Sequence, residues 1–272
     1  MMLITNNTVK HPDFEITLKA GQDFLQHLNQ DQQYWTLYKA MREFGKHLES
    51  INQLECVSHG SRPQIMSALD QSDAQYNGSE LIISDQEVMQ DWEYPLMHNL
   101  ADIVTSKGGD ILEIGFGMAI SASKIVEQNI NSYTVIECNP AVIERFEQWK
   151  SHYPNKEINL IVGRWQDVTE QLQQYDGIIF DAYPVDETDW FNNALNSCSY
   201  AEQFFAIAAA HLNKGGIFTY YTGEIDSISN EHQRQLFRYF SQFNVSVQPN
   251  LHPPADCTYW WNKTMAVVSA IK

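Results

Sequence analysis

From about residue 85 to the C-terminus, short runs rich in β-branched and aromatic residues alternate with longer amphipathic stretches. Such alternation is typical of βαβ units, in which crossover helices return the chain to one end of a parallel sheet. Strands are expected at 110–114, 133–138, 157–162, 176–181, 216–221 and 265–271, with helices near 118–129, 140–152, 198–213 and 228–242. The sequence therefore predicts an α/β fold with a mostly parallel sheet.

The first 84 residues have a different character. Within residues 21–54, apolar side chains such as Trp35 recur near helical spacing without a proline. Glycine, proline and polar residues then predict a linker or irregular cover over 57–84. We expect a helical N-terminal extension over 1–84, acting as a cover or as a homodimer interface, and a second domain over 85–272.

The charge of the chain restricts its partners. The 272 residues include 17 Lys and Arg against 34 Asp and Glu, which gives a net charge of −17. Nucleic acids and anionic membranes attract basic surfaces, so neither is an expected partner. A cationic or neutral small molecule fits better, although excess carboxylates can also serve solubility alone.

The cysteines and the N-terminus bear on location. Four scattered cysteines without a C-x-x-C pair disfavour both a metal site and a disulfide framework. The sequence shows no basic start followed by an apolar run and no stretch long enough to span a membrane. We therefore expect free thiols and a cytoplasmic protein.

A glycine loop follows the first predicted strand. Apolar residues 111–114 run into Gly115 and Gly117 and then into a predicted helix. Glycines at such a turn let a ligand approach the backbone closely. A dinucleotide-binding loop would have a third glycine where this chain has Ile120. Taken alone, the loop can also be a simple strand-to-helix turn.

An acidic residue strengthens the ligand interpretation. Glu137 ends the next predicted strand, at the position where an acid can accept hydrogen bonds from both ribose hydroxyls. Together with the incomplete dinucleotide pattern, this favours S-adenosylmethionine over NAD. Trp165 and Asp167, after the third strand, could border an adenine, although a lone Trp165 would more often be a core residue.

Two carboxylates are candidates for the reaction itself. Asp181 ends the fourth predicted strand, and ligands of open α/β sheets bind beyond the carboxyl ends of the strands. Glu93 lies two residues before Pro95, at a predicted helix start. The alternatives are that Asp181 only forms a turn and that Glu93 only caps its helix.

Seven ordered motifs carry a resemblance to a known family. They are VMQDWEYPLMH (88–98), ILEIGFGMAISASK (111–124), VIECN (135–139), GRWQDV (163–168), YDGIIFDAYP (175–184), LNKGGIFTYY (212–221) and HPPADCTYW (252–260). This part of the chain, residues 85–272, resembles guanidinoacetate N-methyltransferase and its arginine-methylating relatives. The N-terminal region has no clear counterpart.

The resemblance implies a class I methyltransferase fold, a Rossmann-like and mostly parallel seven-stranded sheet with helices on both faces. It implies S-adenosylmethionine as cofactor and S-adenosylhomocysteine as product. Glu137 would bind the ribose, Trp165 and Gln166 would border the adenine, and Gly115 and Gly117 would pass the methionine part. The full expected cofactor set is Met89, Glu113, Gly115, Gly117, Glu137, Cys138, Trp165, Gln166 and Asp181.

The resemblance also implies a substrate site. Glu93 and Asp181 correspond to the two carboxylates that hold the guanidino group, and either of them could take its proton. Tyr183, Gly223 and Glu224 complete the expected substrate set. Acids at Glu224 and Asp226 stand where the family has a Leu-Thr-Ser stretch, so they could bind the α-amino group of free arginine or simply face solvent.

The resulting prediction is an S-adenosylmethionine-dependent N-methyltransferase for the guanidino group of a small molecule, either free arginine or a compound like guanidinoacetate. A protein arginine N-methyltransferase is the first alternative, with the N-terminal helices as a docking module. A binding protein that keeps the cofactor fold without catalysis is the second.

Overall fold

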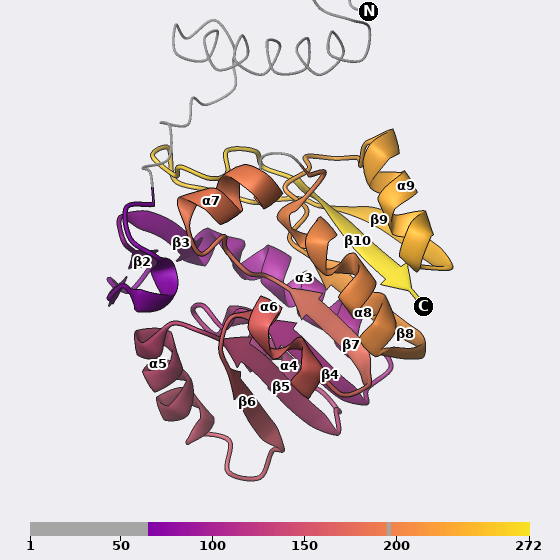
Figure 1. Ribbon diagram of the computed structural model, residues 1–272, viewed down its shortest axis with the longest axis horizontal. Helices are drawn as coiled ribbons and strands as arrows, with labels where there is room; N and C mark the ends of the chain where they lie inside the picture. The colour runs from indigo at the N-terminus through magenta and orange to yellow at the C-terminus, as the bar shows by residue number, and fades with distance from the viewer. Residues whose placement is uncertain (1–64, 195–196) are drawn as a thin grey trace, which may run out of the picture. The chain divides into compact units, whose positions relative to one another are not determined.

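A computed structural model describes residues 65–194 and 197–272, which are built around a seven-stranded sheet (Figure 1). The strand order is β6-β5-β4-β7-β8-β10-β9. The strands are β4 (Asp110–Ile114), β5 (Ser132–Glu137), β6 (Ile158–Val162), β7 (Tyr175–Phe180), β8 (Leu212–Tyr220), β9 (Gln242–Gln248) and β10 (Met265–Ile271). Strands β4 to β8 pair in parallel, and β10 is antiparallel to both β8 and β9. The predicted class I methyltransferase sheet is confirmed.

Helices cover both faces of this sheet. They are α3 (Tyr94–Thr105), α4 (Ile120–Val126), α5 (Pro140–Lys150), α6 (Trp165–Val168), α7 (Glu187–Asp189), α8 (Phe205–His211) and α9 (Asn230–Tyr239). Shorter turns are η1 (Leu69–Gln71), η2 (Asp91–Glu93), η3 (Thr169–Gln171), η4 (Trp190–Ala194) and η5 (Tyr200–Phe204). One core lies under α3, α4 and α5, and a second lies under α6, α8 and α9. None of the helices within the described ranges is long and apolar enough to cross a membrane.

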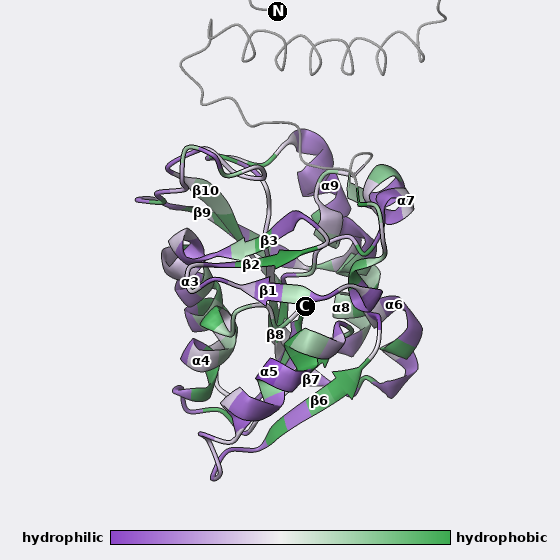
Figure 2. Cartoon of the chain, turned by 90° about the vertical axis from the view of Figure 1, so that its left-hand side faces the viewer, coloured by the Kyte–Doolittle hydropathy of each residue, from purple (hydrophilic) through white to green (hydrophobic). Residues whose placement is uncertain are grey.

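Local sequence explains why several elements begin where they do. Asn139 caps α5, because its side-chain oxygen accepts from the backbone N–H groups of Ala141 and Val142 at 2.9 and 3.2 Å, and Pro140 occupies the first helical position. The central strands β4, β5 and β7 are apolar and largely buried on both faces, as inner strands of a parallel sheet usually are. Figure 2 accordingly shows hydrophobic residues along β6 and β7 and hydrophilic ones on α5 and α6.

The edge strand β9 is absent from the sequence-based prediction. Its residues pair with β10 along the whole length of both strands. Val245 and Val247 are both about 40% exposed, and polar residues separate them. Because this strand buries little, its apolar signal is weak, and the predicted helix over 228–242 extends into its first residue.

A second, smaller sheet corrects the predicted division at residues 84 and 85. Strands β1 (Ala74–Tyr76), β2 (Glu80–Ile83) and β3 (Gln86–Gln90) form an antiparallel sheet in the segment expected to be irregular. The boundary falls in the β2–β3 turn, whose Ser84 and Asp85 have φ values of 52° and 61°. This turn lacks the glycine or asparagine that usually marks a hairpin in sequence. The compact unit begins at Gly60 instead.

The predicted N-terminal helices and the homodimer interface assigned to them lie outside the described residues. Among the described residues before the small sheet, Ile65 and Leu69 are buried with Leu81 and Ile83. Residues 65–84 therefore belong to the same unit as the large sheet.

Candidate active site

The glycine loop after β4 is packed tightly on two sides. Gly115 and Gly117 have φ values of 90° and 52°. A Cβ on Gly115 would lie 2.3 Å from the backbone oxygen of Asp181, and one on Gly117 would lie 2.9 Å from the Met89 sulfur. Backbone therefore excludes a side chain at Gly115, whereas at Gly117 a side chain would strain the positive φ and displace the Met89 side chain. The loop is thereby held between Asp181 and Met89, two of the predicted ligand-binding residues.

Glu137 reaches this loop from the end of β5. Its carboxylate accepts hydrogen bonds from the backbone N–H groups of Phe116 at 3.0 Å, Cys138 at 2.7 Å and Asn139 at 2.9 Å. Burial raises the pKa of Glu137, and these backbone hydrogen bonds oppose that shift. A carboxylate has about four acceptor positions. One remains open on Oε2, so accepting both ribose hydroxyls would require a backbone hydrogen bond to be replaced.

We expect Glu137→Ala to weaken binding of S-adenosylhomocysteine by about 1.5–3 kcal/mol, because a charge-assisted acceptor is lost. Isothermal titration calorimetry measures this change, with circular dichroism to show that the variant is folded. Glu137→Gln is the matched control, since it keeps an acceptor oxygen and should lose less affinity. Unchanged affinity in folded Glu137→Ala would remove Glu137 from the cofactor site.

Glu113 and Cys138 are buried beside the loop. Glu113 is fully buried in β4, where the hydroxyl groups of Ser121 and Tyr133 donate to its two carboxyl oxygens. Burial raises the pKa of Glu113 to about 8. Burial raises the pKa of the Cys138 thiol to about 12, so it stays neutral near pH 7. In this structure Glu113 links β4, α4 and β5 beneath the loop.

The two residues predicted to border the adenine, Trp165 and Gln166, differ in burial. Trp165 is 7% exposed, and its ring meets those of Phe180 and Phe204 edge to face, at centroid distances of 5.8 and 5.4 Å. It therefore belongs to the core under α6 and α8. The next residue, Gln166, is exposed at the surface. Of the two residues, only Gln166 presents its side chain at the surface.

A segment around η1 crosses the ends of three strands. Asn139, after β5, donates from its side chain to the backbone oxygens of Leu69 and Ser72 at 2.6 and 2.7 Å. Arg164, after β6, forms a bidentate ion pair with Asp70 at 2.8 and 3.0 Å. Leu69 also donates to the backbone oxygen of Val185 after β7 at 2.8 Å. No local sequence signal announces these contacts, which join residues far apart in the chain.

Glu93 and Asp181 form the most unusual electrostatic feature of this edge. Glu93, at the end of η2, is 2% exposed, and Asp181 is half-buried directly after β7. Burial raises the pKa of both groups, and the negative charge of Asp181 raises that of Glu93 further. Neither forms an ion pair with a lysine, arginine or histidine in the described part of the chain. Two neighbouring acids without a cation form a site that favours a cationic ligand.

The surroundings of Glu93 fit both roles considered from the sequence, a helix cap and a carboxylate of the substrate site. Its Oε1 accepts from the backbone N–H of Gln90 at 2.9 Å, which is a capping contact, and from the Tyr259 hydroxyl at 2.6 Å. Tyr259 is a site residue that the sequence analysis missed, although it lies in the HPPADCTYW motif. Its segment is held to β3 because Thr258 donates twice to Glu87, at 2.7 and 2.8 Å.

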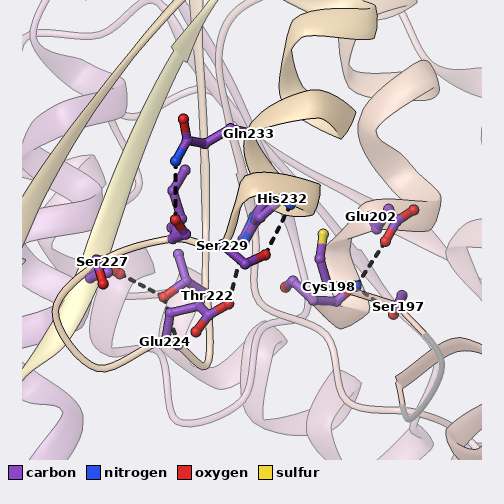
Figure 3. Close-up of polar contacts among 12 residues, drawn as sticks. Ser197, Cys198, Glu202, Thr222, Glu224, Ser227, Ser229, His232 and Gln233 are labelled. Carbon is purple, nitrogen blue, oxygen red and sulfur yellow. Dashed lines mark hydrogen bonds and ion pairs between the residues drawn. The ribbon is translucent and has the colours of Figure 1, made fainter. Parts of the chain in front are cut away.

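The remaining predicted substrate residues lie in different surroundings. Tyr183 follows Asp181 by two residues, and its hydroxyl lies 3.3 Å from the Gln86 side-chain oxygen, to which it donates. Gly223 has open space around its Cα and a φ of 66°. The Glu224 carboxylate lies 3.8 Å from Nδ1 of buried His232, and its backbone N–H donates to Thr222 (Figure 3). Glu224 thus belongs to a second polar cluster, formed with Thr222, Ser229 and His232, and not to the pair Glu93 and Asp181.

Comparison with known proteins identifies the family of the chain. A family model described as guanidinoacetate N-methyltransferase matches residues 58–272. Protein arginine N-methyltransferase 2 of Yarrowia lipolytica is 26% identical over 195 residues, which is 67% of this chain and 38% of that protein. The enzyme of the same name from Emericella nidulans is 29% identical over 148 residues, 51% of this chain and 34% of that one. The chain thus matches little more than a third of the length of these relatives.

Solved structures share the fold. Spermidine synthase from Thermotoga maritima superposes with a TM-score of 0.51 at 13% identity, covering 73% of this chain and 72% of that one. A spermidine synthase complex with the transition-state analogue AdoDATO gives a TM-score of 0.53 at the same identity and coverage. At this identity the likeness concerns the fold alone.

Proposed function

Because the chain belongs to the guanidinoacetate N-methyltransferase family, we propose that it transfers a methyl group from S-adenosylmethionine to a guanidino nitrogen. The observation that carries the proposal is the pairing of Glu93 with Asp181 beside the glycine loop, with no cationic partner among the described residues. A guanidinium has a pKa above about 12 and a planar fork of N–H donors, which carboxylates bind bidentately. It is therefore the cation that this pair fits best.

The chemistry of the donor set at the loop fits the proposed cofactor. Glu137 keeps one open acceptor position for a ribose hydroxyl, and Met89 with Gly115 and Gly117 forms the wall next to Asp181. Gln166 is exposed in the segment that follows β6. S-adenosylmethionine would supply an activated methyl group on its sulfonium when bound. The role of the protein is then to orient the guanidino nitrogen toward that methyl and to remove a proton.

Asp181 is the better candidate for the general base. Oε1 of Glu93 already accepts hydrogen bonds from Tyr259 and Gln90, and both lower the pKa of that carboxyl. The Asp181 carboxylate accepts no hydrogen bond from the residues described, and burial raises its pKa. A carboxylate that accepts no other hydrogen bond is free to take the proton that the guanidinium nitrogen loses as the C–N bond forms. Glu93 would act mainly as the clamp.

We propose a small-molecule guanidine as the substrate, with protein arginine as the second candidate, which the names of the curated relatives favour. The separating experiment incubates the protein with labelled S-adenosylmethionine and free arginine, guanidinoacetate or arginine-containing peptides. Mass spectrometry then identifies the methylated product. Methylation of peptides alone would overturn the small-molecule assignment, and no transfer to any guanidine despite cofactor binding would favour the non-catalytic alternative.

Substrate affinity should rise with pH. In the free protein, burial raises the pKa of both Glu93 and Asp181, and the charge of Asp181 raises that of Glu93 further. A bound guanidinium reverses that shift, so binding releases protons, and affinity increases as pH rises, by up to about tenfold per pH unit for each proton released. Calorimetry with free arginine in buffers of different ionisation enthalpy counts these protons. Binding without proton release would contradict the proposed pairing of the two acids with a cation.

A further inference from the structure

Two neighbouring tyrosines at the end of β8 have opposite surroundings. Tyr220 is buried in the core under α8 and α9, and its hydroxyl lies 2.5 Å from Nε2 of His232. His232 belongs to the second polar cluster with Glu224 (Figure 3). Successive side chains of an extended strand point to opposite faces, and Tyr221 packs against the other core. The two residues thus form a matched pair for comparison.

The Tyr221 hydroxyl is buried but unsatisfied. Within the described ranges its oxygen has no hydrogen-bond partner, although part of the residue is exposed. Buried polar groups are nearly always hydrogen-bonded in folded proteins. A buried hydroxyl without a protein partner therefore points to a partner that arrives with a ligand.

The position of Tyr221 indicates which ligand this is. Its backbone N–H donates to the oxygen of Phe180, the residue before Asp181, at 3.2 Å. Its ring meets that of Trp260 edge to face at 6.4 Å, and Trp260 follows Tyr259, which binds Glu93. Burial raises the pKa of Tyr221 well above its usual value, and the charges of Glu93 and Asp181 raise it further. The phenol is therefore neutral, and both acids lie close enough to influence its pKa.

We propose that the Tyr221 hydroxyl is the third polar contact for the guanidino group. The inference rests on the proposed function and adds a binding residue to it. A monosubstituted guanidinium has five N–H donors, and two bidentate carboxylates accept at most four of them. The phenolic oxygen, which has no partner among the described residues, accepts the fifth. Tyr221 thus orients the substrate without adding charge.

The test compares Tyr221→Phe with Tyr220→Phe. Each variant is assayed for thermal unfolding, for S-adenosylhomocysteine affinity by calorimetry, and for steady-state kinetics on free arginine and guanidinoacetate. Tyr221→Phe should keep or raise the melting temperature, leave S-adenosylhomocysteine affinity unchanged and raise KM roughly tenfold or more. Tyr220→Phe should lower the melting temperature, because His232 loses its partner, and leave KM unchanged.

Several results would overturn the proposal. A lower melting temperature or loss of folding in Tyr221→Phe would show that the hydroxyl has a structural partner. An unchanged KM in a stable Tyr221→Phe variant would show that the hydroxyl does not contact substrate, while leaving the proposed function intact. Wild-type protein that binds S-adenosylhomocysteine but methylates no guanidine would overturn the proposed function and this inference together.

Discussion

We expect Asp181→Asn to lower turnover by roughly 100-fold or more, the scale of a lost general base. Asparagine keeps the shape of the side chain, but it neither accepts a proton nor balances the charge of a guanidinium. Higher substrate concentration should not restore the rate, because the defect lies in the chemical step. Affinity for S-adenosylhomocysteine should change little, since the atoms of Asp181 closest to Gly115 in the loop belong to its backbone.

Steady-state kinetics with labelled S-adenosylmethionine would measure this effect. Asp226→Asn is a suitable control, because it removes the same charge from an exposed residue of the loop after β8. That variant should be nearly as active as the wild type. Near-normal turnover in Asp181→Asn on the true substrate would require both the guanidine assignment and the mechanism to be abandoned.

For Glu93→Gln we expect a defect mainly in KM, on the order of 10- to 100-fold. The glutamine oxygen can still accept from Tyr259 and Gln90, so the local structure should persist. What is lost is the charge that holds the cationic substrate. A variant impaired mainly in kcat, with an unchanged KM, would assign the proton transfer to Glu93 instead of Asp181.

The same variant should alter the pH dependence of stability. Because the pKa of Glu93 is raised in the folded state, the folded protein holds more protons than the unfolded chain. Its contribution to stability is therefore present at low pH and is lost as pH rises through the raised pKa. Glu93→Gln should show a smaller loss of melting temperature between pH 5 and 9, read by thermal unfolding. An identical slope in both proteins would contradict the raised pKa.

Much of the large sheet could be predicted because its signals are local. The buried parallel strands are continuous apolar runs, and the expected strand at 110–114 coincides with β4. Gly115 and Gly117 were recognisable because the positive φ values of such a turn favour glycine. Strand β9 was not predicted because its apolar residues are few and partly exposed. In the small sheet, the β2–β3 turn lacks glycine, and the Asn77-Gly78 pair between β1 and β2 was read as part of a linker.

The sequence by itself determined the fold class, the glycine loop and the candidate acids Glu93, Glu137 and Asp181. Strand periodicity, glycine conformation and position at strand ends are properties of short segments, so they can be read without the tertiary structure. The tertiary structure alone decided what surrounds them. Tyr259 lies 166 residues from Glu93 in the chain. The contrast between Tyr220 and Tyr221 likewise appears only once each hydroxyl is placed among its neighbours. Hydrogen bonds and pKa shifts depend on such long-range neighbours, which no local pattern encodes.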